Sequence, residues 1–168
     1  MTGKPVPAVI KNSVGNFFGE YNKKPYILIE YIEGHHGTDP NNSFNKKEVS
    51  KVVKIIAKLH NLTNEYNPNY FKSRKRFDKK YCLNEYKKAH QNTRNQKEES
   101  WLKNQLKQLI FPKDLPRGLC HADVNYGNFL FNKNKIVAVL DFDMSSYNYF
   151  IYDIANLIYW WALPPEKG

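Results

Sequence analysis

The sequence predicts a fold of the α+β class, because strand signals and helix signals occupy separate blocks of the chain. β-rich runs fill residues 5–33, three helical patterns follow between residues 46 and 110, and an apolar hairpin pattern precedes a last apolar helix. Such segregation is typical of α+β domains, whereas regular alternation predicts a parallel α/β sheet. With 168 residues, the chain is long enough to bury one substantial core.

The first 33 residues carry the strand signals. Residues 6–10 are short and apolar, Phe17 and Phe18 follow a turn at Gly15, and residues 25–32 form a β-rich run after a polar turn. Residues 34–42 contain two glycines, a proline and two histidines, so we expect a connector there.

Three segments have helical periodicity. Asn45 and Glu48 resemble a capping box, and the apolar spacing that follows predicts an amphipathic helix over residues 46–62. A weaker pattern predicts a helix over residues 78–92, and a better one predicts a helix over residues 98–110 that Pro112 ends. We expect residues 64–73 to be a polar loop.

The C-terminal third contains a hairpin and an apolar helix. Residues 129–131 and 136–140 are apolar strands joined by a polar turn. Residues 149–161 are apolar nearly all round, interrupted only by Asp153 and Asn156, so this predicted helix requires burial on every face. An unpaired carboxylate in such a helix would be costly, so Asp153 is expected to have a partner.

The composition excludes several classes of protein. The formal charge of +10 comes from 26 Lys and Arg against 16 Asp and Glu, but only four of the basic residues are Arg. Nucleic-acid readers favour Arg, whose planar fork matches phosphates and guanine edges, so no nucleic-acid partner is expected. The basic run over residues 72–80 could hold phosphates, but we interpret it as a solvated face.

The sequence also predicts a cytoplasmic protein with no membrane partner. No stretch approaches the ~20 apolar residues that span a bilayer, and residues 1–11 lack the apolar centre of a signal peptide. Cys82 and Cys120 are too few for a disulfide framework. Adjacent strand side chains point to opposite faces, so His121 is poorly placed to activate Cys120, which we interpret as a core residue.

Residues 115–153 carry a pattern with chemical meaning. Asn128 lies five residues after Asp123 in a His-x-Asp-x₄-Asn motif, and Asp141 lies thirteen residues after Asn128. Phosphoryl transfer requires a group that orients a hydroxyl and hard oxygen ligands that hold Mg²⁺ against the nucleotide phosphates. The motif matches the catalytic loop of kinases, and the hairpin between Asn128 and Asp141 would bring the second carboxylate beside the amide.

Each of these residues also has a structural interpretation. Asp123 and Asn128 could form Asx-turns, Asp141 could cap a following helix, and His121 could be a hydrogen-bonded core histidine. The complete pattern favours a site for the first three residues. For Asp143, metal-adjacent, substrate-facing and exposed positions all stay open.

Residues 115–131, LPRGLCHADVNYGNFLF, resemble the catalytic loop of the aminoglycoside phosphotransferase and choline kinase group, and are most similar to bacterial homoserine kinases. Residues 6–11, 24–34 and 57–63 also resemble that family. The resemblance implies a protein-kinase-like fold. Residues 1–33 would be the remnant of a small N-terminal β lobe with the interlobe hinge, and residues 34–168 an incomplete, mainly helical C-terminal lobe.

The resemblance implies an ATP- and Mg²⁺-dependent phosphotransferase. Asp123 would be the catalytic base or hydroxyl-orienting group, and Asn128 and Asp141 would be the metal ligands. The acceptor would be a hydroxyl of a small metabolite, with homoserine first and choline or an aminoglycoside next.

Five further residues take roles from the same resemblance. Glu30, Tyr31 and Ile32 would form the hinge that offers backbone groups to the adenine of ATP. His121 and Asp153 would brace the catalytic loop.

The chain also departs from the family pattern at both ends. Residues 8–11 look like the lysine strand of kinases, but no glutamate-bearing helix fits between Lys11 and the hinge, so Lys11 is not expected to be the phosphate lysine. We therefore expect a truncated kinase in which missing segments or an oligomer partner would cover residues 149–161. The alternative function is an inactive fragment or pseudokinase that acts, if at all, by binding a partner.

Overall fold

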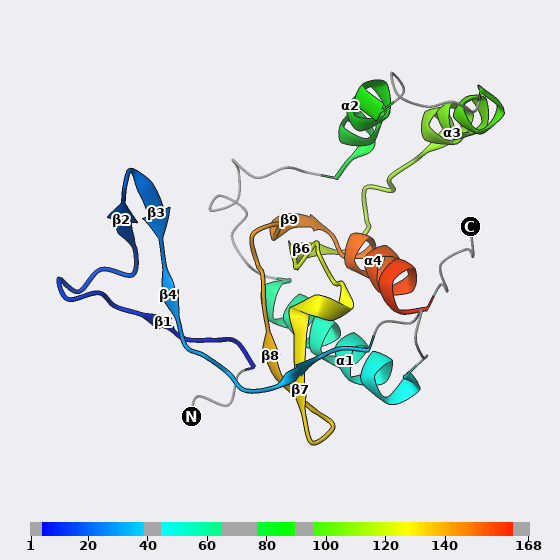
Figure 1. The fold of residues 1–168 in the computed structure, drawn as a ribbon. Helices are drawn as coiled ribbons and strands as arrows, with labels where there is room; N and C mark the ends of the chain where they lie inside the picture. The colour runs from blue at the N-terminus through cyan, green and yellow to red at the C-terminus, as the bar shows by residue number, and fades with distance from the viewer. Residues whose placement is uncertain (1–4, 39–44, 65–76, 90–95, 163–168) are drawn as a thin grey trace. The chain divides into compact units, whose positions relative to one another are not determined.

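The computed structural model describes residues 5–38, 45–64, 77–89 and 96–162 (Figure 1). The chain divides into two compact units, which are described separately. The first unit consists of Met1–Ile55, Asp123–Asp143 and Asn156–Gly168, and the second of Ile56–Ala122 and Met144–Ala155. The expected lobe boundary after residue 33 stays a prediction.

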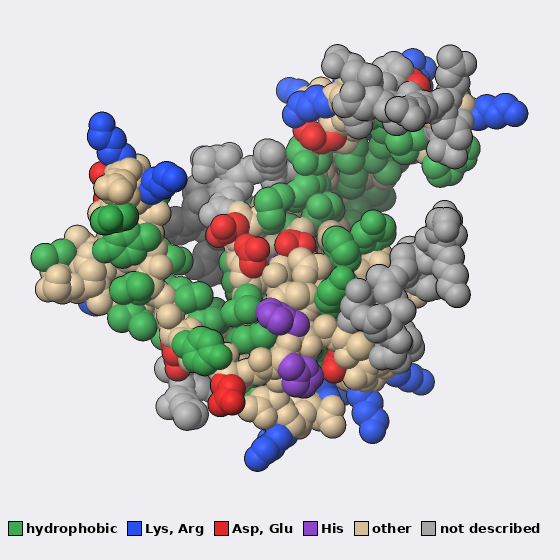
Figure 2. Space-filling model, viewed as in Figure 1, with side chains coloured by type: hydrophobic (Ala, Val, Ile, Leu, Met, Phe, Trp, Pro, Cys, Tyr) green, Lys and Arg blue, Asp and Glu red, His purple; other side chains and the backbone are tan. Residues whose placement is uncertain are grey.

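The N-terminal strands of the first unit form two small antiparallel ribbons. Strand β1 (Val9–Ile10) pairs with β4 (Leu28–Ile29), and β2 (Gly19–Tyr21) pairs with β3 (Lys24–Tyr26). No side chain of residues 5–36 is buried, and many hydrophobic side chains of this segment are exposed, among Lys and other polar groups (Figure 2). Two-stranded ribbons are only marginally stable by themselves in water, so this segment supplies little of the core.

The core of the first unit contains a three-stranded antiparallel sheet in the order β5-β7-β8. Strands β7 (Phe129–Asn132) and β8 (Lys135–Val139) form the predicted hairpin (Figure 1). Lys133 and Asn134 have positive φ in its turn. Strand β5 (His35–His36) pairs with β7 inside the segment expected to be a connector. That expectation was wrong for these two residues, because their backbone groups complete the ladder on the free edge of β7.

Helix α1 (Lys46–Thr63) confirms the first predicted helix. The side chain of Asn45 accepts hydrogen bonds from the backbone N–H of Lys47 at 3.2 Å and of Glu48 at 3.3 Å. The Glu48 carboxylate accepts the backbone N–H of Thr38 at 2.9 Å, so it ties the preceding chain to the helix start.

The second unit contains a two-stranded antiparallel sheet that the sequence did not predict. Strand β6 (Arg117–Cys120) pairs with β9 (Ser146–Tyr149). Because residues 146–149 form β9, the last helix, α4 (Ile151–Trp161), begins two residues later than predicted. Helices α2 (Lys79–Ala89) and α3 (Gln96–Gln108) confirm the two remaining predicted helices. Helix α2 begins one residue later than predicted, and α3 begins and ends two residues earlier than predicted.

Helix α4 has one buried face and one exposed face. Asp153, Leu157 and Trp161 are buried, whereas Ile151, Ile154 and Ile158 are about half exposed. The described residues therefore do not provide the all-round burial that the composition of this helix requires. The expectation that missing segments or an oligomer partner cover the exposed face stays a prediction.

Two segments interpreted from the sequence lie wholly or mostly outside the described residues. The basic run over residues 72–76 and most of the polar loop at residues 64–73 lie outside the described residues.

None of the helices within the described ranges has the length and apolar character needed to cross a membrane.

Candidate active site

The loop after β6 leads directly to Asp123, and its backbone is held by a buried carboxylate. Oδ2 of Asp153 accepts the N–H of His121 at 2.9 Å, and Oδ1 accepts the N–H of Ala122 at 2.8 Å. Ala122 has φ of 69°, in the left-handed region that is costly for an L-residue. The two hydrogen bonds therefore stabilise a backbone conformation that alanine would not otherwise favour. His121 itself is fully buried.

Two amide side chains fix the carboxylate of Asp123. Asn125 Nδ2 donates to Oδ1 at 2.9 Å, and Asn128 Nδ2 donates to Oδ2 at 2.9 Å. Asn128 Nδ2 also donates to the backbone carbonyl of Asp123 at 2.9 Å. One donor on each oxygen determines the orientation of the half-buried carboxylate.

Asn125 was missed by the sequence interpretation, although its position carries a signal. Its Oδ1 accepts the backbone N–H of Gly127 at 2.8 Å and caps the short 3₁₀ helix η3 (Tyr126–Asn128). An Asn two residues before a Gly is a common Asx-turn pattern. This turn leaves the Nδ2 group of Asn125 available for Asp123, so one side chain shapes the loop and orients the carboxylate.

The β7–β8 hairpin brings Asp141 close to Asn128 along the backbone. Phe129 pairs with Val139, and the N–H of Leu140 donates to the carbonyl of Asn128 at 2.8 Å. Asp141 follows Leu140 directly, is exposed, and has φ of 57°. No helix follows it within the next nine residues, so the alternative that Asp141 caps a helix is wrong.

Asn128 and Asp141 have the chemistry of a magnesium site. The Nδ2 group of Asn128 is engaged by Asp123, so its Oδ1 is the atom left for a cation, and no donor among the described residues bonds it. Asp141 adds an exposed carboxylate, one oxygen of which accepts the N–H of Asp143 at 3.3 Å. The neutral oxygen of half-buried Asn128 and the anionic oxygens of exposed Asp141 suit Mg²⁺, which prefers oxygen ligands and keeps several waters. Asp143 is exposed.

A second group of potential ligands suits a metal poorly. Ligand atoms of His60, Cys120 and Asp153 lie within 4.8 Å of one another in the second unit, and all three residues are buried. Burial raises the pKa of the Cys120 thiol far above its ordinary value, so the thiol stays protonated, and it donates to the carbonyl of Tyr149 at 3.4 Å. Both oxygens of Asp153 already accept hydrogen bonds, so this cluster is a hydrogen-bonded core.

Further contacts that the sequence did not reveal hold the loop beyond Asp123. Trp161, at the end of α4, donates its Nε1–H to the carbonyl of Val124 at 2.7 Å. The backbone N–H of Gly37 lies 3.0 Å from the carbonyls of Tyr126 and Phe129. Residues far apart in sequence thus satisfy the carbonyl groups of a loop that contains little regular structure.

The expected hinge residues come directly after strand β4. Glu30 follows β4, and its N–H donates to the carbonyl of Ala8 at 2.8 Å. Glu30 and Tyr31 are exposed and Ile32 is half-buried. The Lys11 amine lies 5.0 Å from the centre of the Phe17 ring, in a cation–π contact.

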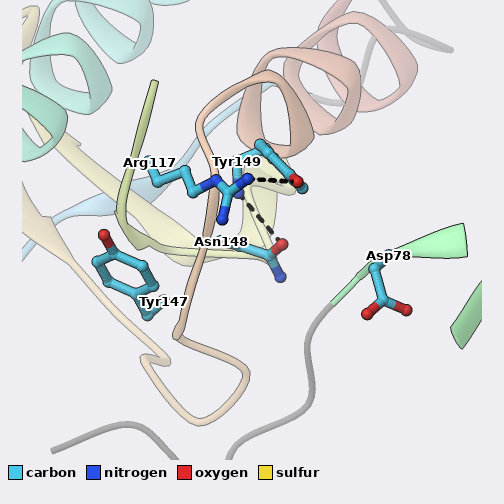
Figure 3. Close-up of a pocket in the computed structure, with 5 residues that line it drawn as sticks. All are labelled: Asp78, Arg117, Tyr147, Asn148 and Tyr149. Carbon is cyan, nitrogen blue, oxygen red and sulfur yellow. Dashed lines mark hydrogen bonds between the residues drawn. The ribbon is translucent and has the colours of Figure 1, made fainter. Parts of the chain in front are cut away.

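The second unit also contains a small pocket of about 70 Å³ (Figure 3). It is lined by Asp78, Arg117, Tyr147, Asn148 and Tyr149. Arg117 Nη2 donates to the Tyr149 hydroxyl at 2.7 Å, and its guanidinium lies 4.3 Å from the centre of the same ring. The pocket contains none of the residues of the catalytic motif, and its one arginine is already engaged.

Comparison of the sequence with models of known protein families identifies the family of this chain. Residues 2–167 match the model described as the phosphotransferase enzyme family. The chain belongs to this family.

Two kinases of known name align with nearly the whole chain. Amicoumacin kinase of Bacillus subtilis (strain 168) is 30% identical over 172 residues, which cover 98% of this chain and 47% of that protein. Homoserine kinase of Nitrobacter winogradskyi is 25% identical over 164 residues, covering 96% of this chain and 49% of that protein. The chain thus spans about half the length of these relatives.

Solved structures confirm the protein-kinase-like α+β fold of this phosphotransferase chain. Amicoumacin kinase hAmiN, in complex with AMP-PNP, Ca²⁺ and Ami, matches with a TM-score of 0.64 at 21% identity, over 98% of this chain and 51% of that one. Aminoglycoside phosphotransferase APH(4)-Ia, in a ternary complex with ADP and hygromycin B, matches with a TM-score of 0.58 at 17% identity, over 95% of this chain and 57% of that one.

Proposed function

We propose that this chain carries the catalytic loop and metal ligands of an enzyme that transfers the γ-phosphoryl group of ATP to a hydroxyl of a small metabolite. The observation that carries the proposal is the Asp123 carboxylate, which Asn125 and Asn128 hold by one hydrogen bond on each oxygen. Phosphoryl transfer depends mainly on positioning and charge stabilisation, so an oriented carboxylate next to metal ligands is the feature it requires.

Asp123 is the residue that accepts or orients the acceptor hydroxyl. An ionised carboxylate has about four acceptor positions, so one that accepts from two amides is chemically able to accept from a hydroxyl as well. A hydroxyl that donates to one of them has its oxygen turned towards the phosphoryl group. His121 and Asp153 brace the backbone that precedes Asp123.

Asn128 and Asp141 hold Mg²⁺. When bound, the ion neutralises charge on the nucleotide phosphates and on the phosphoryl group in transfer. The role of Asn128 would be twofold, because its Nδ2 orients Asp123 while its Oδ1 would serve as the metal ligand. The backbone pairing of Asn128 with Leu140 keeps this amide next to the strand end that carries Asp141.

The nucleotide is ATP, with the backbone of Glu30, Tyr31 and Ile32 as its adenine contact. Structures of similar fold were solved with AMP-PNP or ADP, which supports a nucleotide substrate. Lys11 is not assigned to the phosphates. We place the enzyme in the cytoplasm, where ATP and small metabolites are available, in agreement with the low cysteine content.

Homoserine is the first acceptor to test. Several relatives at 24–25% identity over nearly the whole chain are homoserine kinases. Amicoumacin kinase, at 30% identity, and a probable choline kinase, at 39% over 54 residues, widen the class to other amino alcohols and hydroxylated antibiotics. Homoserine and choline both combine a hydroxyl group with a cationic nitrogen.

Replacing Asp123 by Asn tests the proposal. We measure ADP release from Mg·ATP by the 168-residue chain with homoserine, choline, an aminoglycoside and amicoumacin. With the acceptor that supports turnover, Asp123→Asn should lower kcat by about 10²–10⁴-fold, the usual contribution of a positioned acid–base group. The exposed Asp114→Asn is the matched control and should retain wild-type turnover.

Two results would contradict the proposal. Turnover by Asp123→Asn close to that of the wild type would remove Asp123 from the chemistry. Absence of transfer to every acceptor, together with absence of nucleotide binding, would favour the alternative of an inactive chain that acts by binding a partner.

A further inference from the structure

We propose that His36 is a positioning residue for this reaction, acting through the carbonyl of Gly127 on the metal ligand proposed above, Asn128. The assignment rests on the function proposed for Asn128. His36 belongs to strand β5, lies outside the His-x-Asp-x₄-Asn motif and precedes Gly127 by 91 positions. From the sequence we expected only a connector in this segment.

The side chain of His36 makes a short hydrogen bond to the catalytic loop. Its Nδ1 lies 2.7 Å from the carbonyl oxygen of Gly127. Because a carbonyl oxygen only accepts, the contact requires the proton on Nδ1, and in the neutral ring Nε2 is then the unprotonated nitrogen. The imidazolium form carries a proton on both nitrogens, so the donor is present in either charge state.

This hydrogen bond holds the peptide group that leads into Asn128. The carbonyl of Gly127 and the N–H of Asn128 belong to one planar peptide group. Its N–H donates to the carbonyl of Asn125 at 3.1 Å, and its oxygen accepts from His36. The backbone from which the Asn128 side chain projects is therefore held on both sides.

Gly127 makes this peptide group depend on a contact from outside the loop. Glycine has no Cβ, so it restricts the orientation of the peptide that follows it less than other residues do. The carbonyl of Tyr126 accepts from the backbone N–H of Gly37 at 3.0 Å, and that of Asn128 accepts from the N–H of Leu140 at 2.8 Å. The carbonyl of Gly127, between these two, accepts from a side chain instead.

The backbone that carries the imidazole is itself fixed beside the loop. His36 pairs with Leu130 in the antiparallel ladder of β5 and β7. The next backbone N–H, that of Gly37, lies 3.0 Å from the carbonyls of Tyr126 and Phe129. Since the backbone is already held, the hydrogen bond from Nδ1 requires the ordering of only one side chain.

The competing explanation is that water would satisfy the Gly127 carbonyl equally well, because His36 is exposed. The test compares His36→Asn with His36→Leu, two side chains of similar shape. Asn presents an N–H near the position of Nδ1, whereas Leu lacks a donor. Both variants should fold, because surface substitutions usually change stability little.

His35→Leu is the control for the loss of an imidazole from the same strand. His35 is also exposed, but its Nδ1 lies 3.0 Å from the carbonyl oxygen of His36, and its ring stacks on Phe131. Its removal should therefore leave the peptide group before Asn128 unchanged.

The first readout is nitrogen–proton correlation NMR of the imidazole rings, because it does not require activity. The spectrum distinguishes a ring protonated on Nδ1 from one protonated on Nε2. The His36 signal is identified by its absence from His36→Asn, and we expect it to show the proton on Nδ1 in the neutral form. A neutral His36 ring protonated on Nε2 would overturn the proposal.

Amide hydrogen exchange of the 168-residue chain is the second readout. Exchange at Asn128 should accelerate in His36→Leu by about three- to tenfold, the usual effect of losing one hydrogen bond. The β7 and β8 amides, which report opening of the sheet, should keep their wild-type rates. His36→Asn should restore protection, and His35→Leu should not alter it. Equal exchange at Asn128 in the Asn and Leu variants of His36 would contradict the assignment.

The Mg²⁺ dependence of transfer separates this inference from the proposed function. In an active enzyme, His36→Leu should raise the Mg²⁺ concentration for half-maximal rate by about three- to tenfold, and His36→Asn should restore it. Faster exchange at Asn128 in a chain without transfer activity would retain the role of His36 in the loop and reject the proposed function. Transfer with an unchanged Mg²⁺ requirement in His36→Leu would retain the proposed function and reject this inference.

Discussion

The two polar atoms of the Asn128 side chain, Nδ2 and Oδ1, have different hydrogen-bonding capacities, and each has a separate role. Nδ2 can only donate and is directed at Asp123, so Oδ1, which can only accept, is left for a cation. An aspartate at this position would repel Asp123, and a leucine would leave it without its donor. The residue type is thus required by its neighbour as well as by the proposed metal.

Removing the Asp141 carboxylate should impair the use of Mg²⁺. We expect Asp141→Ala to lower kcat by about 10²-fold or more, because a bound metal contributes several kcal/mol to the transition state and 1.4 kcal/mol corresponds to a factor of ten. Titration of the rate with Mg²⁺ should show a higher concentration for half-maximal activity. Asp114→Ala is the control, and an unchanged Mg²⁺ requirement in Asp141→Ala would exclude Asp141 as a ligand.

Cys120 should be unreactive in the folded chain. Its burial raises the pKa of the thiol, so the reactive thiolate is scarce at neutral pH and inaccessible to reagents. In Cys82→Ser, we expect a disulfide reagent to label Cys120 only as fast as the protein opens. Because the folded-state pKa is raised, the contribution of this thiol to the free energy of unfolding should fall as pH rises above about 8.5. Labelling at the rate of a free thiol would contradict the structure.

At the residue scale, the motif itself was predictable and its supports were not. Asp123, Asn128 and Asp141 stand at fixed spacings within one segment, so their proximity follows from a loop and a hairpin. Asn125 lies inside the motif, but its contact with Asp123 depends on a turn geometry that the spacing alone does not specify. His60 meets Asp153 across 93 residues, and no local pattern encodes that pairing.

At the element scale, the end of α4 and the segment after β5 are tightly fitted to each other. A Cβ atom on Gly37 would lie 2.5 Å from a ring carbon of Trp161 and 2.9 Å from the carbonyl oxygen of Tyr126. The Trp161 ring cannot move freely, because its Nε1–H donates to the carbonyl of Val124. Gly37 is required by this close approach.

Substitution of Gly37 by Ala should therefore destabilise the chain. We expect a loss of about 1–3 kcal/mol in the free energy of unfolding, the usual cost of overpacking a closed site, measured by urea denaturation. Gly15→Ala is the comparison, since nothing lies within 4 Å of its Cβ position and only its φ of 86° opposes the change. A smaller loss for Gly37→Ala than for Gly15→Ala would show that this contact is absent in solution.

Elements with clear periodicity were predicted, and elements that depend on a distant partner were not. Helix α1 and the β7–β8 hairpin have their signals within the segment, in the spacing of apolar residues and in the turn. Strands β5, β6 and β9 contain few apolar residues, and each is a strand only because another segment pairs with it.

At the scale of the whole molecule, nucleotide binding should stabilise the chain if the proposed site forms in it. Mg·ATP at about 100 times its dissociation constant should add about 2.7 kcal/mol to the free energy of unfolding. For a chain of this size, that corresponds to an increase of roughly 5–10 °C in Tm. Thermal unfolding with and without Mg·ATP measures the shift.

Asp141→Ala is the variant that makes the thermal measurement specific. The shift should be lost in this variant and retained in Asp114→Ala, because only the former changes a proposed ligand. A shift that survives in Asp141→Ala would locate the nucleotide elsewhere. Absence of a shift in the wild type would mean that this chain, about half as long as its curated relatives, does not form the nucleotide site alone.

The sequence by itself determined the α+β class, the main helices, the hairpin and the spacing of Asp123, Asn128 and Asp141, because each depends on residues close together in the chain. Only the tertiary structure decided what holds these residues: Asn125 on Asp123, Asp153 on the loop backbone, His60 on Asp153, and Trp161 on Val124. The Asn125 contact is local and depends on the geometry of a turn, whereas the other three contacts join segments distant in sequence. Those three are selected by burial, since a polar group removed from water requires a partner wherever the fold can supply one.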